Sequence, residues 1–160
     1  MNGGMELYLH MPFCVRKCAY CDFLSFPSGA ETQRMYAKRL MEDIDVMGKR
    51  YGEIPVETIF IGGGTPSVPD SGLIVEIMEH VRHAFHVADG AEISMEANPG
   101  TVTREKLTDY RKAGINRLSF GLQSANDREL KLLGRIHTWA EFLESFTLAR
   151  ECGFANLNID

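Results

Sequence analysis

The chain has 160 residues, of which 44% are hydrophobic and 24% charged, and this is the composition of a globular domain with a real core. A formal net charge of −5 and the lack of a Lys- or Arg-rich run argue against nucleic-acid binding. No stretch has the length of a membrane span and no basic-then-apolar leader opens the chain, so we expect a cytoplasmic protein with reduced thiols.

Apolar residues recur with two different periods along the chain. A period of two predicts strands near Leu7–Met11, Thr58–Ile61, Ile93–Glu96, Arg117–Leu122 and Asn156–Asp160. Helical stripes separate them, at Tyr36, Leu40, Ile44 and Met47, at Ile74, Ile77, Met78, Val81 and Phe85, and at Leu107 and Tyr110. Two more helices are expected before the last strand, a short one from Asn126 to Gly134 and one that follows a capping box of Thr138 and Glu141. This order predicts an α/β fold with a parallel sheet and right-handed crossovers.

A short internal repeat supports this order. Arg111–Ile115 and Arg150–Phe154 share the pattern Arg-x-x-Gly-apolar and lie 39 residues apart, which is a plausible length for one strand–helix unit. The repeat places Asp160 where Gly121 stands, at the carboxyl end of a strand.

Each predicted strand has one clean apolar row and one polar row. Buried parallel strands covered by helices on both sides would be apolar on both faces, so the polar rows must face water or a polar ligand. We therefore expect a partial, open (β/α) barrel with a polar interior, with about five strands in this chain; a one-sided sheet with a solvated face is the alternative. Because the chain ends on an uncovered strand, we expect residues 1–160 to be the N-terminal part of such a barrel, with the remaining barrel and a C-terminal domain absent.

Three of the four cysteines, Cys14, Cys18 and Cys21, lie within eight residues directly after the first strand. Thiolates select zinc, copper(I) or iron–sulfur clusters, and a four-iron cluster held by only three cysteines keeps one iron open for chemistry. A structural zinc site with His10 or a distant group as fourth ligand stays open, although no second close pair of cysteines exists. The crowding disfavours a disulfide framework, and we expect Cys152 to be a small buried hydrophobe.

Other chemically suggestive residues also fall at predicted carboxyl ends of strands, which form the functional rim of α/β barrels. Gly62–Pro66 would let backbone approach a ligand closely, and it lacks the Lys-Ser/Thr of a phosphate loop. Glu96, Gln123 and Asp160 offer hydrogen-bonding groups to hydroxyls or an ammonium group, and Arg135 suits a carboxylate. His10 and His137 are expected to be structural or surface residues.

These residues stand within blocks that resemble a known family. The segment Tyr8–Phe23 resembles the cluster motif of the radical S-adenosylmethionine superfamily, and more closely that of the HemN/HemW group, the oxygen-independent coproporphyrinogen III oxidases and their haem-chaperone relatives. Further blocks resemble that group over the rest of the chain, at Ile59–Ser67, Glu96–Gly100, Arg117–Ser124, Leu133–Thr138 and Asn156–Asp160.

The resemblance implies a [4Fe–4S] cluster on Cys14, Cys18 and Cys21, with S-adenosylmethionine on the open iron. An electron from a small-molecule donor or a flavodoxin-type reductant would then split the sulfonium into methionine and a 5′-deoxyadenosyl radical. By the family pattern the cofactor pocket is lined by Tyr8, Tyr20, Gly63, Gly64, Thr65, Glu96, Gln123, Arg135 and Asp160. No catalytic residue is assigned.

One position separates the two branches of the group. The oxidases carry another cysteine two residues after the third ligand, where this chain has Phe23. The Asp-Phe form is similar to the haem chaperones, so the resemblance implies a protein that binds haem as cargo and transfers it to haem-requiring proteins. An oxygen-independent coproporphyrinogen III oxidase and a zinc-stabilised, non-enzymatic binding module are the alternatives.

Overall fold

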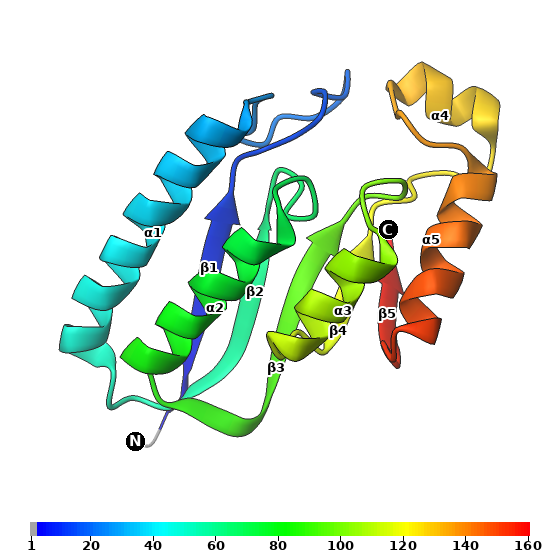
Figure 1. Cartoon of the computed structure of the whole chain (residues 1–160). Helices are drawn as coiled ribbons and strands as arrows, with labels where there is room; N and C mark the ends of the chain where they lie inside the picture. The colour runs from blue at the N-terminus through cyan, green and yellow to red at the C-terminus, as the bar shows by residue number, and fades with distance from the viewer. Residues whose placement is uncertain (1–2) are drawn as a thin grey trace.

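A computed structural model describes residues 3–160 and contains a five-stranded, all-parallel sheet (Figure 1). Its strands are β1 (Met5–Met11), β2 (Val56–Gly63), β3 (Val87–Ala97), β4 (Arg117–Phe120) and β5 (Asn156–Ile159). They are neighbours in chain order, β1-β2-β3-β4-β5. The predicted α/β class and parallel sheet are therefore confirmed.

The helices connect the strands, and four of them pack side by side in one layer. They are α1 (Ala30–Tyr51), α2 (Ser71–Ala84), α3 (Arg104–Lys112), α4 (Asp127–Leu133) and α5 (Trp139–Glu151). Helix α1 packs on α2, α2 on α3 and α3 on α5, while α4 lies above α5 at the carboxyl end of the sheet (Figure 1). Right-handed crossovers between strands in simple sequential order bring every connection to the same side of the sheet. In Figure 1, α2 and α3 cross in front of the strands, while α1 and α5 flank the two edges.

The core lies between this helical layer and one face of the sheet. Met11, Ile61, Met95 and Leu118 are at most 1% exposed and supply that face from four neighbouring strands. They pack with buried helical residues such as Ile74, Ile77, Leu107 and Phe142 in one apolar cluster.

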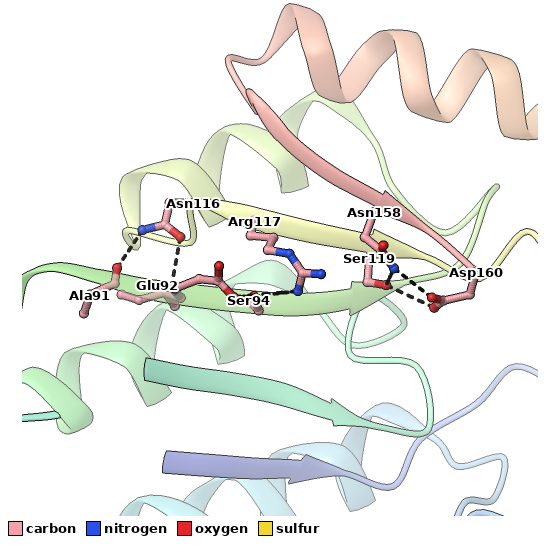
Figure 2. A network of polar contacts seen from close by, with 9 residues as sticks. Ala91, Glu92, Ser94, Asn116, Arg117, Ser119, Asn158 and Asp160 are labelled. Atoms are coloured by element: carbon pink, nitrogen blue, oxygen red, sulfur yellow. Dashed lines mark hydrogen bonds and ion pairs between the residues drawn. The ribbon is translucent and has the colours of Figure 1, made fainter. Parts of the chain in front are cut away.

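The other face of the sheet carries a network of polar side chains from the region of β3, β4 and β5 (Figure 2), and the right-handed crossovers place the connecting helices of residues 3–160 on the opposite side. Asn158 donates to Ser119 Oγ at 2.9 Å, and Ser119 Oγ donates to Asp160 at 3.0 Å. Arg117 donates to Ser94 Oγ at 3.1 Å. The predicted polar interior of a partial, open barrel is thus present.

Several strand ends differ from those predicted. Strand β3 begins at Val87 rather than near Ile93, and β2 runs into the glycine run as far as Gly63. Strand β4 ends at Phe120 rather than Leu122, because the chain turns there. Gln123 has φ 71° and its amide donates to Asp160 O at 2.7 Å.

The 39-residue repeat corresponds to two equivalent helix–strand turns. Gly114 and Gly153 both have φ 87°, a left-handed conformation that glycine adopts without a steric penalty. The arginine that opens each turn donates to a carbonyl four residues on, Arg111 to Ile115 and Arg150 to Phe154. Cys152 in the second turn packs against the apolar cluster as expected, but it is half-buried rather than buried.

Within residues 3–160, no helix combines the length and the apolar character that crossing a bilayer requires.

Candidate metal and cofactor site

One pocket opens at the carboxyl end of the sheet, where the predicted site residues meet. Eleven of the twelve line it, namely Cys14, Cys18, Tyr20, Cys21, Gly63, Gly64, Thr65, Glu96, Gln123, Arg135 and Asp160. They come from the loop after β1, the end of β2, the end of β3, the turn after β4, the loop after α4 and the end of β5. The convergence follows from topology, since parallel strands all end at the same edge.

The cysteine loop is fastened at both of its ends. Phe26 donates to Pro12 O at 2.9 Å, and Cys14 N donates to Phe26 O at 3.2 Å, so the loop closes beside the end of β1. Within the loop, Cys21 N donates to Cys18 O at 3.2 Å. Arg16 reaches across to donate to Gly134 O at 2.6 Å. All three thiols are free and half-buried in the same pocket.

The spacing of these thiols bears on the kind of metal they could hold. Across residues 3–160, no three His, Cys, Asp or Glu side chains are close enough together to coordinate one metal ion. A four-iron cluster has a different requirement, because each cysteine bonds to its own iron atom.

His10 lies behind the cysteine loop with both ring nitrogens engaged. Leu24 O lies 3.0 Å from Nε2 and can only accept, so Nε2 carries the proton, while Nδ1 accepts from the Tyr8 hydroxyl at 3.0 Å. His10 therefore makes structural hydrogen bonds, as expected, and presents no free nitrogen as the fourth zinc ligand; the distant group that the zinc alternative also allowed is not addressed by these contacts.

The glycine run serves the packing of the chain on itself. A Cβ at Gly64 would lie 2.7 Å from Phe13 O, and one at Gly63 would lie 2.5 Å from the His10 ring. Gly63 also has φ 114°. The absence of side chains lets the end of β2 lie directly against the cysteine loop, with Thr65 N donating to Phe13 O at 2.7 Å.

Asn98 was not predicted as a site residue, yet it lines the pocket and joins its two sides. Its Nδ2 donates to Thr65 Oγ1 at 2.9 Å, and its Oδ1 accepts from Arg135 Nη2 at 2.7 Å. Thr65 Oγ1 lies 3.6 Å from Cys14 Sγ, and Arg135 Nη1 donates to Cys18 Sγ at 3.8 Å. The only sequence signal was its place two residues after Glu96 in one of the family-like blocks.

The carboxylates of the pocket lie in different surroundings. Burial raises the pKa of Glu96, and this outweighs the hydrogen bond from Gly63 N at 3.0 Å, while the nearby charge of Asp160 raises the pKa further. Asp160 accepts from Ser119 and Asn158 on the open face of the sheet (Figure 2).

The remaining predicted residues fall in three places. Tyr20 lies against Arg135, whose Nη1 is 3.4 Å from its hydroxyl, and burial raises the Tyr20 pKa. Tyr8 does not line the pocket; it is 58% exposed on β1 and stacks on Phe60. His137 is buried and structural, with its Nε2 on Leu122 O at 3.2 Å. Burial, followed by the charge of Arg135, lowers its pKa.

Comparison with known proteins assigns the family. Residues 8–160 match the Radical SAM superfamily. The chain belongs to this superfamily. Membership implies S-adenosylmethionine and a [4Fe–4S] cluster as its cofactors, and the pocket just described holds the three cysteines that the sequence resemblance assigned to that cluster.

Among individual proteins, the chain is similar to haem chaperones named HemW. It is 42% identical over 157 residues to the haem chaperone HemW of Escherichia coli (strain K12) and 38% identical over 161 residues to that of Haemophilus influenzae, covering 98% of this chain in both cases. It spans 42% of the length of each of these relatives.

Solved structures support the fold. The coproporphyrinogen III oxidase HemN of Escherichia coli, described as a radical SAM enzyme, covers the whole chain with a TM-score of 0.89 at 28% identity, and the chain covers 37% of it. The hydrogenase maturase HydG matches with a TM-score of 0.63 at 14% identity, which is a likeness of fold alone.

Proposed function

We propose that this chain is the cluster- and cofactor-binding part of a haem chaperone of the HemW type. The observation that carries the proposal is the gathering of three free thiols in the pocket formed by the carboxyl ends of the parallel strands. The 36–42% identity to HemW proteins of three bacteria supports the choice of branch.

The pocket residues fit the implied cofactors by their chemistry. Cys14, Cys18 and Cys21 would hold a [4Fe–4S] cluster, and the donor set is the soft one such a cluster takes. When bound, the cluster supplies one electron and one open iron for S-adenosylmethionine. Arg135 offers a donor-only group for a carboxylate, and Glu96, Gln123 and Asp160 offer acceptors for an ammonium group or ribose hydroxyls.

This chain's own residues would orient and restrain that cofactor. Gln123 has a left-handed backbone conformation, and its backbone N–H donates a hydrogen bond to Asp160 O, so its backbone is held at the rim of the pocket rather than along a strand. Arg135 is anchored on Asn98, and its buried Nε has no hydrogen-bond partner among the described residues. An unpaired buried donor of this kind is costly unless a ligand satisfies it.

Phe23 favours the chaperone over the oxidase. It lines the pocket and is 67% exposed at the position where the oxidases of this group carry a further cysteine. We propose that haem is the cargo, that haem-requiring proteins receive it, and that a small-molecule donor or a flavodoxin-type protein supplies the electron in the cytoplasm.

The test is anaerobic reconstitution of the chain with iron and sulfide. We expect about four iron and four sulfide ions per chain. Cys14→Ala should lose nearly all of both, because the two remaining cysteine ligands are too few to hold the cluster. Cys152→Ala is the matched control, since Cys152 is also a free, half-buried thiol but lies outside the pocket, and it should keep the full iron content.

Three further outcomes decide between the functions. One zinc per chain without iron or sulfide would favour the zinc-stabilised module and contradict the proposal. Haem binding with no turnover of coproporphyrinogen III in a longer form of the protein would support the chaperone. Turnover of that porphyrinogen would make it an oxidase instead.

A further inference from the structure

A chain of hydrogen bonds crosses the pocket from Arg135 to Cys14. It runs from Arg135 Nη2 to Asn98 Oδ1 at 2.7 Å, from Asn98 Nδ2 to Thr65 Oγ1 at 2.9 Å, and from Thr65 Oγ1 to Cys14 Sγ at 3.6 Å. Its members come from segments far apart in sequence.

The direction of these hydrogen bonds is fixed by chemistry. A guanidinium can only donate, so the oxygen of Asn98 must face Arg135 and its NH₂ group must face Thr65. Because Thr65 Oγ1 accepts there, its own proton is free to point at the sulfur. A metal-bound cysteine is a thiolate that can only accept, so both ends of the chain require the same direction.

The surroundings hold this chain in place. Thr65 is 2% exposed, and its amide donates to Phe13 O at 2.7 Å. The backbone amide of Asn98 donates to Ser67 Oγ at 3.2 Å, and its carbonyl accepts from Thr101 Oγ1 at 2.7 Å. These backbone contacts fix the positions from which the two side chains reach each other.

We propose that Asn98 and Thr65 are positioning residues that aim one hydroxyl proton at the Cys14 sulfur and thereby raise the reduction potential of the cluster. The inference rests on the proposed function, since it needs a cluster on Cys14. Hydrogen bonds to the sulfurs are among the factors that set iron–sulfur potentials, because they stabilise the extra electron of the reduced cluster. A second donor, Arg135 Nη1, acts on Cys18 at 3.8 Å, so one arginine influences two of the three ligands.

The experiment is a redox titration of the reconstituted chain without S-adenosylmethionine, followed by absorbance and electron paramagnetic resonance. Thr65→Val removes the hydroxyl at nearly constant volume and should shift the midpoint potential to more negative values. Thr65→Ser keeps the hydroxyl and should restore the parent value. In competition with a chelator, the affinity for iron should be about 10-fold lower for Thr65→Val than for the parent, the lower end of what loss of an outer partner costs.

Asn98→Asp tests the direction of the chain. A carboxylate still accepts from Arg135 but cannot donate to Thr65, so the hydroxyl turns toward the carboxylate and away from Cys14. The new charge also lowers the potential, so the double variant with Thr65→Val is required. We expect Asn98→Asp to shift the potential less when it is combined with Thr65→Val than in the parent, because no hydroxyl remains there to turn.

Asn116→Ala is the matched control. Asn116 is a half-buried asparagine that also joins two segments, donating to Ala91 O at 2.8 Å and accepting from Ile93 N at 2.9 Å (Figure 2). It does not line the pocket that holds the cysteines. Its loss should leave the potential unchanged. Equal midpoint potentials in Thr65→Val and the parent would overturn the proposed role of Asn98 and Thr65 and leave the cluster assignment standing. A shift in Asn116→Ala as large as that in Thr65→Val would do the same. Failure of the parent chain to take up iron would overturn both.

Discussion

The helix-covered face and the open face of the sheet stabilise the same five strands by different means. Leu118 and Ser119 are adjacent on β4; the leucine is fully buried in the apolar cluster, while the serine bonds Asp160 and Asn158 on the polar side. The covered face gains its stability from apolar area removed from water. The open face gains little from apolar burial, but its polar groups hold one another in place (Figure 2), and two of them, Ser119 and Asp160, also line the pocket.

The largest expected effect comes from deleting volume on the covered face. Leu118→Ala should lower the free energy of unfolding by about 2–5 kcal/mol, because a cavity replaces a fully buried side chain. Tyr8→Ala on the open face is the comparison and should cost less, about 1–2 kcal/mol, from its stacking on Phe60 and its hydrogen bond to His10. Urea unfolding of both variants measures the difference, and equal losses would mean that the two faces are not distinct.

A second prediction concerns Glu96, a carboxylate near the end of β3 that lines the pocket. Its pKa in the folded chain is raised above the ordinary value of 4.5, mainly by burial, so the native state holds the proton more tightly than the unfolded state does. Stability should therefore fall as the pH rises from about 4.5 through the raised pKa, and the full penalty persists above it.

Glu96→Gln removes this penalty while an amide oxygen can still accept from Gly63 N. The variant should be more stable than the parent at pH 7.5, and the gain should shrink as the pH approaches 4. Glu144→Gln, at an exposed position on α5, gives the background change. A gain that is the same at both pH values would show that Glu96 protonation does not set it.

The comparison of faces also explains which features the sequence could predict. Strict alternation in strands such as Leu7–Met11 identified both faces, and the rule that parallel strands end at one edge predicted the meeting of Cys14, Glu96 and Asp160. The features that the sequence did not predict depend on contacts between segments that are far apart in the chain. The end of β4 is set by the bond from Gln123 to Asp160, and the importance of Asn98 arises only once Thr65 and Arg135 are brought to either side of it.

The smallest effect is expected at Arg117, in the middle of the open face. It donates to Ser94 Oγ at 3.1 Å and lies 3.7 Å from Glu92, with the two charged side chains 25% and 49% exposed. Ion pairs this exposed contribute about 0–1 kcal/mol, because water solvates both charges and salt screens them. Arg117→Met keeps the length of the side chain and should lower the free energy of unfolding by less than about 1 kcal/mol, and about 1 M NaCl should narrow the difference. A loss of several kcal/mol, insensitive to salt, would instead mean that this face is dry and that Arg117 is a buried partner of Glu92.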